Sequence, residues 1–160
     1  MRLIIATIGK LKSGPEQALV ERYVTRAASG LKNTGFGKFE ILELPESKKP
    51  QTIQRQEDEG QRLLDKLPSS FQLVVFDERG KSLSSEGFAD YLGSSAEGGA
   101  SDLVMVIGGP DGVSTNFRER ADLVVSFGKL TMPHQIVRAL VAEQIYRATT
   151  ILSGHPYHRQ

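Results

Sequence analysis

The 160-residue sequence contains no cysteine and no tryptophan. Without cysteine the chain forms no disulfide, holds no metal through thiolates and has no cysteine nucleophile. Its longest apolar runs, such as residues 103–107, are far too short to cross a bilayer, and the N-terminal run is too short for a signal peptide. We therefore expect a soluble, cytoplasmic protein.

The common nucleotide and hydrolase motifs are also missing. No G-x-G-x-x-G follows an expected strand, and neither G-x-x-x-x-G-K-[ST] nor G-x-S-x-G occurs. Dinucleotide-dependent dehydrogenases, P-loop enzymes and serine hydrolases of the elbow type therefore lose support. The three histidines are His134, His155 and His158, with no carboxylate close to the last two in sequence, so we expect no metal site.

Charge is nearly balanced, with 20 Lys+Arg against 19 Asp+Glu, but it is unevenly distributed. Residues 1–50 carry 9 basic and 5 acidic side chains, residues 51–110 carry 5 and 10, and residues 111–160 carry 6 and 4. No segment is basic enough for tight, sequence-independent binding of nucleic acid through counterion release. An RNA partner would have to be recognised by shape or as a preassembled particle.

Apolar runs alternate with segments of helical period along the whole chain. The length and the 39% apolar content fit one compact domain over residues 1–160. The alternation predicts an α/β fold whose mostly parallel sheet has helices on both faces. We expect strands at residues 3–8, 39–44, 71–76, 103–107 and 123–126. We expect helices opening at residues 13–16 and 84–86 and covering 52–67, 114–121 and 133–152, and residues 94–101 to form a small-residue linker.

Three loops follow expected strands at the edge where parallel sheets bind ligands. They are residues 76–81, residues 108–112 (Gly-Gly-Pro-Asp-Gly) and residues 128–134. Paired glycines allow a ligand to approach the backbone, because no Cβ stands in the way. Taken alone, residues 110–112 are better explained as a simple turn.

The last helix and the C-terminus carry the remaining polar candidates. His134 and Arg138 are four residues apart at the start of this helix, where the helix dipole disfavours protonation of His134. His134 suits a neutral hydrogen-bonding group or weak base, and equally a simple cap. Glu143 and Arg147 are best interpreted as an intrahelical ion pair. Residues 155–160 combine two imidazoles, a phenol and a guanidinium, which are groups that stack on bases and contact phosphates.

Five segments recur in the order typical of one family. They are Asp-Glu-Arg-Gly-Lys (77–81), Ile-Gly-Gly-Pro-Asp-Gly (107–112), Leu-Thr-Met-Pro-His (130–134), Ala-Glu-Gln-Ile-Tyr-Arg-Ala (142–148) and Pro-Tyr-His-Arg (156–159). Together they resemble the SPOUT-class ribosomal RNA large subunit methyltransferase H family, which modifies a pseudouridine of large-subunit ribosomal RNA. The resemblance spans nearly the whole chain. Phe76 and Met132 stand where this family commonly has leucine.

The resemblance implies a C-terminal trefoil knot, a homodimer and S-adenosyl-L-methionine (AdoMet) held in the knot. Its motifs place the cofactor at Phe76, Gly108, Gly109, Gly128, Lys129, Leu130, Thr131, Met132 and Pro133. The implied reaction methylates N3 of a pseudouridine in 23S ribosomal RNA, on the assembled ribosome.

Our catalytic candidates are Arg138, stabilising a deprotonated uracil edge or a phosphate, and His134, as hydrogen-bond partner or base. We expect Tyr157, His158 and Arg159 to contact the RNA, across the dimer interface if the protein dimerises as implied. Two alternatives remain from the sequence. One is a ribosome-binding factor that kept the fold without catalysis, and the other is a flavodoxin-like or other nucleotide-binding domain.

Overall fold

A computed structural model describes residues 1–159 of the chain. Strands β1 (Arg2–Ile8), β2 (Lys38–Leu44), β3 (Gln72–Lys81), β4 (Asp102–Ile107) and β5 (Leu123–Val125) form one sheet in the order β2-β1-β4-β3-β5. Every pairing is parallel. The predicted parallel α/β sheet is confirmed, whereas the trefoil knot stays a prediction.

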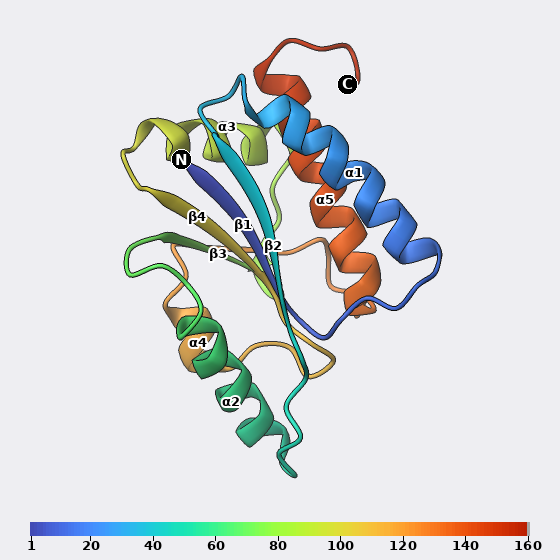
Figure 1. The fold of residues 1–160 in the computed structure, drawn as a ribbon, viewed down its shortest axis with the longest axis vertical. Helices are drawn as coiled ribbons and strands as arrows, with labels where there is room; N and C mark the ends of the chain where they lie inside the picture. The colour runs from blue at the N-terminus through green and yellow to red at the C-terminus, as the bar shows by residue number, and fades with distance from the viewer. Residues whose placement is uncertain (160) are drawn as a thin grey trace.

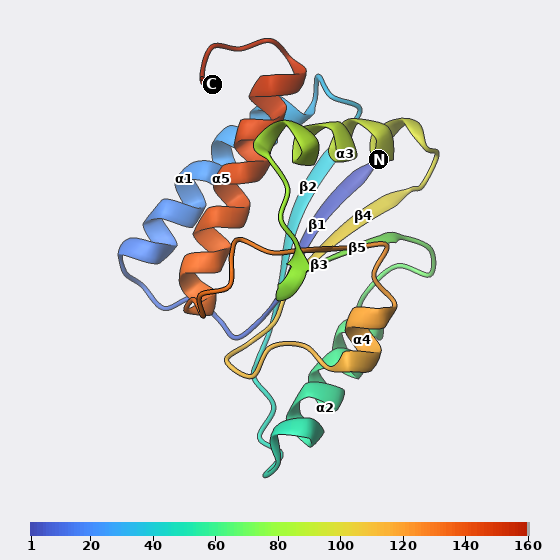
Figure 2. The same cartoon turned by 180° about the vertical axis from the view of Figure 1, so that it is seen from behind.

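Helices cover both faces of this sheet (Figures 1 and 2). Helices α1 (Pro15–Leu31), α3 (Ser85–Glu97) and α5 (His134–Leu152) lie on one face, and α2 (Thr52–Leu64) and α4 (Thr115–Glu119) lie on the other. None of the helices in residues 1–159 is long and apolar enough to cross a membrane.

Alternate residues of the central strands supply the two cores. Leu3, Ile5 and Met105 pack toward α1, α3 and α5. Ile4 and Val104 pack toward Leu63 of α2 and Phe117 of α4, among other residues. Successive side chains of a strand point to opposite faces, so a strand covered on both faces is apolar without a break. This explains the burial of all six residues of β4.

Three expected boundaries differ from the structure by three residues or more. The first half of the expected linker at residues 94–101 belongs to α3, which runs to Glu97 because Leu92 and Ser95 are buried on its inner face. Helix α2 ends at Leu64, three residues early, in a tight turn. Strand β3 continues to Lys81, which pairs with Val125 after a register shift, so residues 77–81 are an irregular strand extension.

Candidate functional site

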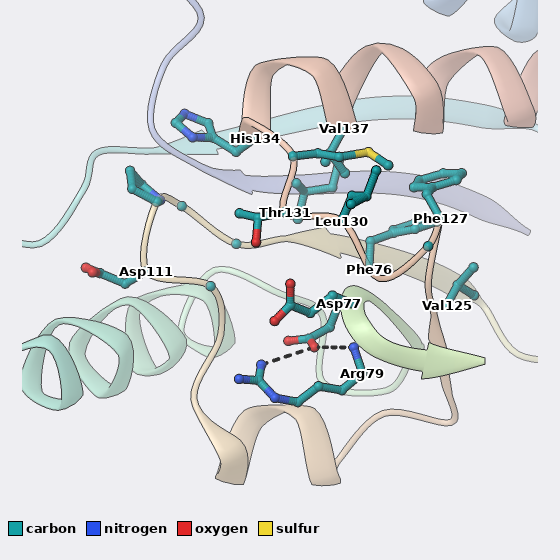
Figure 3. Close-up of a pocket in the computed structure, with 18 residues that line it drawn as sticks. Phe76, Asp77, Arg79, Asp111, Val125, Phe127, Leu130, Thr131, His134 and Val137 are labelled. Atoms are coloured by element: carbon teal, nitrogen blue, oxygen red, sulfur yellow. Dashed lines mark hydrogen bonds and ion pairs between the residues drawn. The ribbon is translucent and has the colours of Figure 1, made fainter. Parts of the chain in front are cut away.

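The three loops predicted to bind a ligand meet in one cavity of about 250 Å³. It lies at the carboxyl ends of β3, β4 and β5, next to the first turn of α5 (Figure 3). A parallel sheet brings these ends to a common edge, which explains why segments far apart in sequence meet here. The cavity is lined by Phe76, Asp77, Glu78, Arg79, Ile107, Gly108, Gly109, Pro110, Asp111, Gly112, Val125, Phe127, Gly128, Leu130, Thr131, Met132, His134 and Val137.

Most residues that the resemblance assigned to the cofactor line this cavity. They are Phe76, Gly108, Gly109, Gly128, Leu130, Thr131 and Met132. Lys129 and Pro133 belong to the same segment but are not among the lining residues. Of the two catalytic candidates, His134 lines the cavity and Arg138 does not.

One wall of the cavity is aromatic. The rings of Phe76 and Phe127 stack with centroids 5.4 Å apart and planes inclined by 7°, and Phe88 packs edge-on against Phe76 from α3. Such a wall suits a flat aromatic group because stacking and area burial both favour it. Leu130 faces the same space with 80% of its surface exposed, which is unusual for a leucine beside a cavity.

The opposite wall is backbone of the glycine-rich turn after β4. A Cβ on Gly108 would lie 2.7 Å from the carbonyl carbon of Gly112, and a Cβ on Gly109 would lie 2.9 Å from Cγ2 of Ile8. Gly112 has φ +74°, which L-residues rarely adopt. The turn is closed by the Gly112 N–H donating to the Gly109 carbonyl at 3.0 Å. Packing therefore requires glycine at position 108, and the backbone conformation favours glycine at position 112, whether or not a ligand binds.

Asp77 supplies the main buried negative charge beside the cavity, with a side chain only 5% exposed. The Arg79 backbone N–H donates to its carboxylate at 2.9 Å, and the Arg79 guanidinium approaches it to 3.3 Å (Figure 3). The Arg118 guanidinium also approaches it to 3.3 Å. The two arginines balance this charge.

Asp77 and Phe127 were not among the predicted cofactor residues. A sequence signal existed for both residues. Asp77 directly follows the expected strand at residues 71–76, and Phe127 lies between the expected strand at residues 123–126 and Gly128. The stacking of Phe127 on Phe76 depends on β3 and β5 being neighbours, which periodicity does not determine.

His134 begins α5 at the edge of the cavity. Burial and the nearby positive charge of Arg138 lower its pKa, while Glu46 opposes this shift. The imidazole is therefore neutral at physiological pH and can accept a hydrogen bond. This direction agrees with the expectation for a histidine at a helix N-terminus, and burial is its largest cause.

Arg138 is 4% exposed and serves contacts within the protein. Its guanidinium donates to Oε1 of Glu43 at 2.7 Å, to the carbonyl of Ile8 at 2.8 Å and to the carbonyl of Gly9. These bonds join α5 to the ends of β1 and β2. Burial lowers the pKa of Arg138 and Glu43 counteracts it, and a guanidinium stays charged despite such a shift.

The C-terminal segment lies at the opposite end of α5 from the cavity (Figure 1). Its Tyr157 hydroxyl donates to Glu143 at 3.1 Å, and its His158 contacts both Arg147 and Glu86. Glu143 and Arg147 form the expected ion pair. Arg159 is exposed. Of the three predicted RNA contacts, Tyr157 and His158 are half-buried against α5, and none reaches the cavity of its own chain.

A family model and a solved structure both indicate the class to which this protein belongs. The model of the family described as "Predicted SPOUT methyltransferase" matches residues 1–158. A crystal structure of a hypothetical protein shares the fold, with a TM-score of 0.52 and 14% identity over 94% of this chain and 80% of that one.

Two relatives then narrow the class. The ribosomal RNA large subunit methyltransferase H of Allorhizobium ampelinum is 48% identical over 159 residues, 99% of each chain. The protein of the same name from Bartonella tribocorum is 46% identical over the same share of both chains. The chain therefore belongs to the SPOUT methyltransferases and, among them, to the ribosomal RNA large subunit methyltransferase H family.

Proposed function

We propose that this protein transfers a methyl group from AdoMet to N3 of a pseudouridine in 23S ribosomal RNA, on the assembled ribosome. The observation that carries the proposal is the cavity at the ends of β3, β4 and β5, which gathers residues from three of the five family segments. Full-length similarity to proteins named ribosomal RNA large subunit methyltransferase H supports the RNA substrate.

The residues of the cavity fit AdoMet. Phe76 and Phe127 offer an apolar wall for the adenine. Gly108 and Gly109 line the cavity without side chains, so a ligand can approach their backbone. Backbone groups of residues 128–132 would hold the remainder of the cofactor. When bound, AdoMet supplies an activated methyl group on a sulfonium, so the protein needs no metal for this transfer.

The protein contributes alignment and help with one proton. N3 of the pyrimidine must lose its proton before or during methylation, and neutral His134 lies at the edge of the cavity as a hydrogen-bond acceptor or base. Arg138 was expected to touch the uracil edge or a phosphate. Its burial and its bonds to Glu43 and Ile8 instead favour a role in holding α5, and with it His134, against β1.

We further propose that the protein acts as a homodimer in which the tail of one subunit contacts RNA at the cavity of the other. Helix α5 has 19 residues and is therefore about 28 Å long, and it separates the tail from the cavity of its own chain. Leu130 is exposed beside the cavity, and Ile136 is exposed on the first turn of α5. Both provide apolar surface that a second subunit would cover.

The test is transfer of labelled methyl from AdoMet to ribosomes lacking the modification, with 70S particles, free large subunits and naked RNA compared in parallel. Label at N3 of one pseudouridine of 23S RNA, with 70S ribosomes as the best substrate, is the expected result. Label on another base would contradict the pseudouridine assignment.

A second candidate is a ribosome-binding factor without catalysis. The cavity disfavours it, because a binding factor has no need of an open cofactor pocket. Binding to ribosomes that neither requires AdoMet nor transfers label would support this candidate over the methyltransferase.

A further inference from the structure

Arg55 on α2 contacts the glycine-rich turn of the cavity from outside. Its Nε lies 2.7 Å from Oδ2 of Asp111, and its Nη2 lies 3.2 Å from Oδ1. Both side chains are 26% exposed, so water screens this two-point contact only in part. The neighbouring Gln56 donates to the backbone carbonyl of Asp111 at 2.7 Å. The first turn of α2 therefore holds both the side chain and the main chain of Asp111.

The same guanidinium also organises the loop that precedes α2. Nη1 of Arg55 donates to the carbonyls of Lys49 and Pro50 at 3.2 and 3.1 Å, and Nη2 reaches the Thr52 hydroxyl at 3.0 Å. Five contacts from one side chain fix Arg55 in a single position. A side chain that is already ordered loses little entropy when it restrains a neighbour.

Asp111 is the residue through which Arg55 reaches the cavity. It lies inside the turn closed by Gly109 and Gly112, and it lines the cavity. In Figure 3 its carboxylate points away from Phe76 and Leu130. Arg55 thus holds this carboxylate on the α2 side of the turn and neutralises it.

We infer that Arg55 is a positioning residue for AdoMet binding, acting through Asp111 on the turn from Gly109 to Gly112. This inference rests on the proposed function. Arg55 itself does not line the cavity, so its removal changes the order of the turn rather than a direct contact with cofactor. Gln56 still holds the turn when Arg55 is replaced, so the expected effect is a weakening and not an abolition of binding.

The primary experiment measures AdoMet affinity by titration calorimetry in the wild type and in Arg55→Met. We expect the dissociation constant to rise about tenfold, as loss of roughly one charged hydrogen-bonded contact would produce, with kcat at saturating AdoMet unchanged. Amide exchange at Gly112 in the free protein should accelerate in parallel, because its N–H bond to Gly109 closes the turn.

Arg62→Met is the matched control. Arg62 is on the same helix, pairs with Asp58 at 3.0 Å and donates to the Pro45 carbonyl, but does not contact the glycine-rich turn. This variant should leave AdoMet affinity and Gly112 exchange at wild-type values. In an Asp111→Ala background, Arg55→Met should add little further loss, because the two residues act in series.

The outcomes separate this inference from the proposed function. If the wild type binds AdoMet and Arg55→Met binds it equally well, or if Arg62→Met weakens it as much, the positioning role is overturned while the methyltransferase stands. If the wild type binds no AdoMet, both the proposed function and this inference are contradicted. A fully additive effect of Arg55→Met on Asp111→Ala would also overturn the inference.

Discussion

Nε2 of His158 lies 2.7 Å from Oε1 of Glu86, which joins the C-terminal segment to the first turn of α3. On the other side of the ring, Nη1 of Arg147 lies 3.2 Å from Nδ1. A neutral imidazole protonated on Nε2 satisfies both contacts, since it donates to Glu86 and accepts from Arg147. A hydrogen bond from its own backbone N–H is the largest cause that lowers the pKa of Glu86, and the hydrogen bond with His158 is the next.

Loss of this contact should loosen the tail without unfolding the protein. We expect Glu86→Ala to accelerate amide exchange of residues 157–159 by about threefold, because a partly exposed contact contributes only a fraction of a kcal/mol to about 1 kcal/mol. Asp90→Ala is the control: Asp90 is exposed on the same helix and has no ion pair within residues 1–159. Equal exchange in both variants would show that Glu86 does not hold the tail.

If the tail of one subunit contacts RNA at the cavity of the other, two impaired variants should complement each other in a mixed dimer. Gly108→Ala disables the cavity and Arg159→Ala weakens the contact of the tail with RNA, so each homodimer alone should transfer methyl groups much more slowly than the wild type. Mixing them equally through unfolding and refolding should restore about a quarter of wild-type methyl transfer, since half the dimers then contain one complete site. No recovery in the mixture would mean that each tail serves its own chain.

Arg159→Ala alone should separate RNA binding from cofactor binding. Arg159 is exposed and remote from the cavity, so the variant should bind ribosomes and methylate them more weakly while AdoMet affinity stays unchanged. Calorimetry with AdoMet and sedimentation with ribosomes measure the two properties. An equal loss of AdoMet binding would contradict the RNA-contact assignment.

The glycine-rich turn should tolerate no side chain at its first position. Gly108→Ala places a Cβ 2.7 Å from the backbone of Gly112, which must then move. Overpacking of this kind costs about 3 kcal/mol, so we expect the affinity for AdoMet to fall by about a hundredfold or more. Gly37→Ala, where a Cβ meets nothing within 4 Å, should bind AdoMet normally. Retained binding in Gly108→Ala would place the cofactor elsewhere.

Arg138 should matter for stability as well as activity. Arg138→Met removes a buried charge that Glu43 and two backbone carbonyls depend on, and we expect the free energy of unfolding to fall by about 2–4 kcal/mol. Urea denaturation measures this directly. Arg22→Met, at an exposed position of α1, should change it by less than about 0.5 kcal/mol. Wild-type stability in Arg138→Met would restore the direct catalytic role as the better interpretation.

The lowered pKa of His134 makes stability depend on pH in a defined direction. The folded protein resists protonating this ring, whereas the unfolded chain takes up the proton near the ordinary pKa of 6.5. The unfolded state therefore binds more protons below pH 6.5, and stability falls as pH decreases from there toward the folded pKa, by at most about 1.4 kcal/mol per pH unit. Denaturation of the wild type and His134→Asn from pH 5 to 8 tests this. The free energy of unfolding of His134→Asn should depend less on pH in this range than that of the wild type. An unchanged pH dependence would contradict the lowered pKa of His134.

The sequence alone determined the α/β class, because the strands are short apolar runs and the helices have a distinct period. It also placed the ligand loops, since loops after parallel strands share one edge. Phe76, the Gly108–Gly109 pair and residues 128–132 were predicted for the cavity and line it, apart from Lys129. That prediction depended on recognising five segments in order, as each segment alone is common.

Only the tertiary structure decided what each polar side chain contacts. His134 and Arg138 are four residues apart, yet one faces the cavity and the other is buried against Glu43, 95 residues away in sequence. The contact between Arg55 and Asp111 joins residues 56 positions apart. Such pairs depend on strand order and on where helices cross the sheet, and these follow from packing of the whole core rather than from local periodicity.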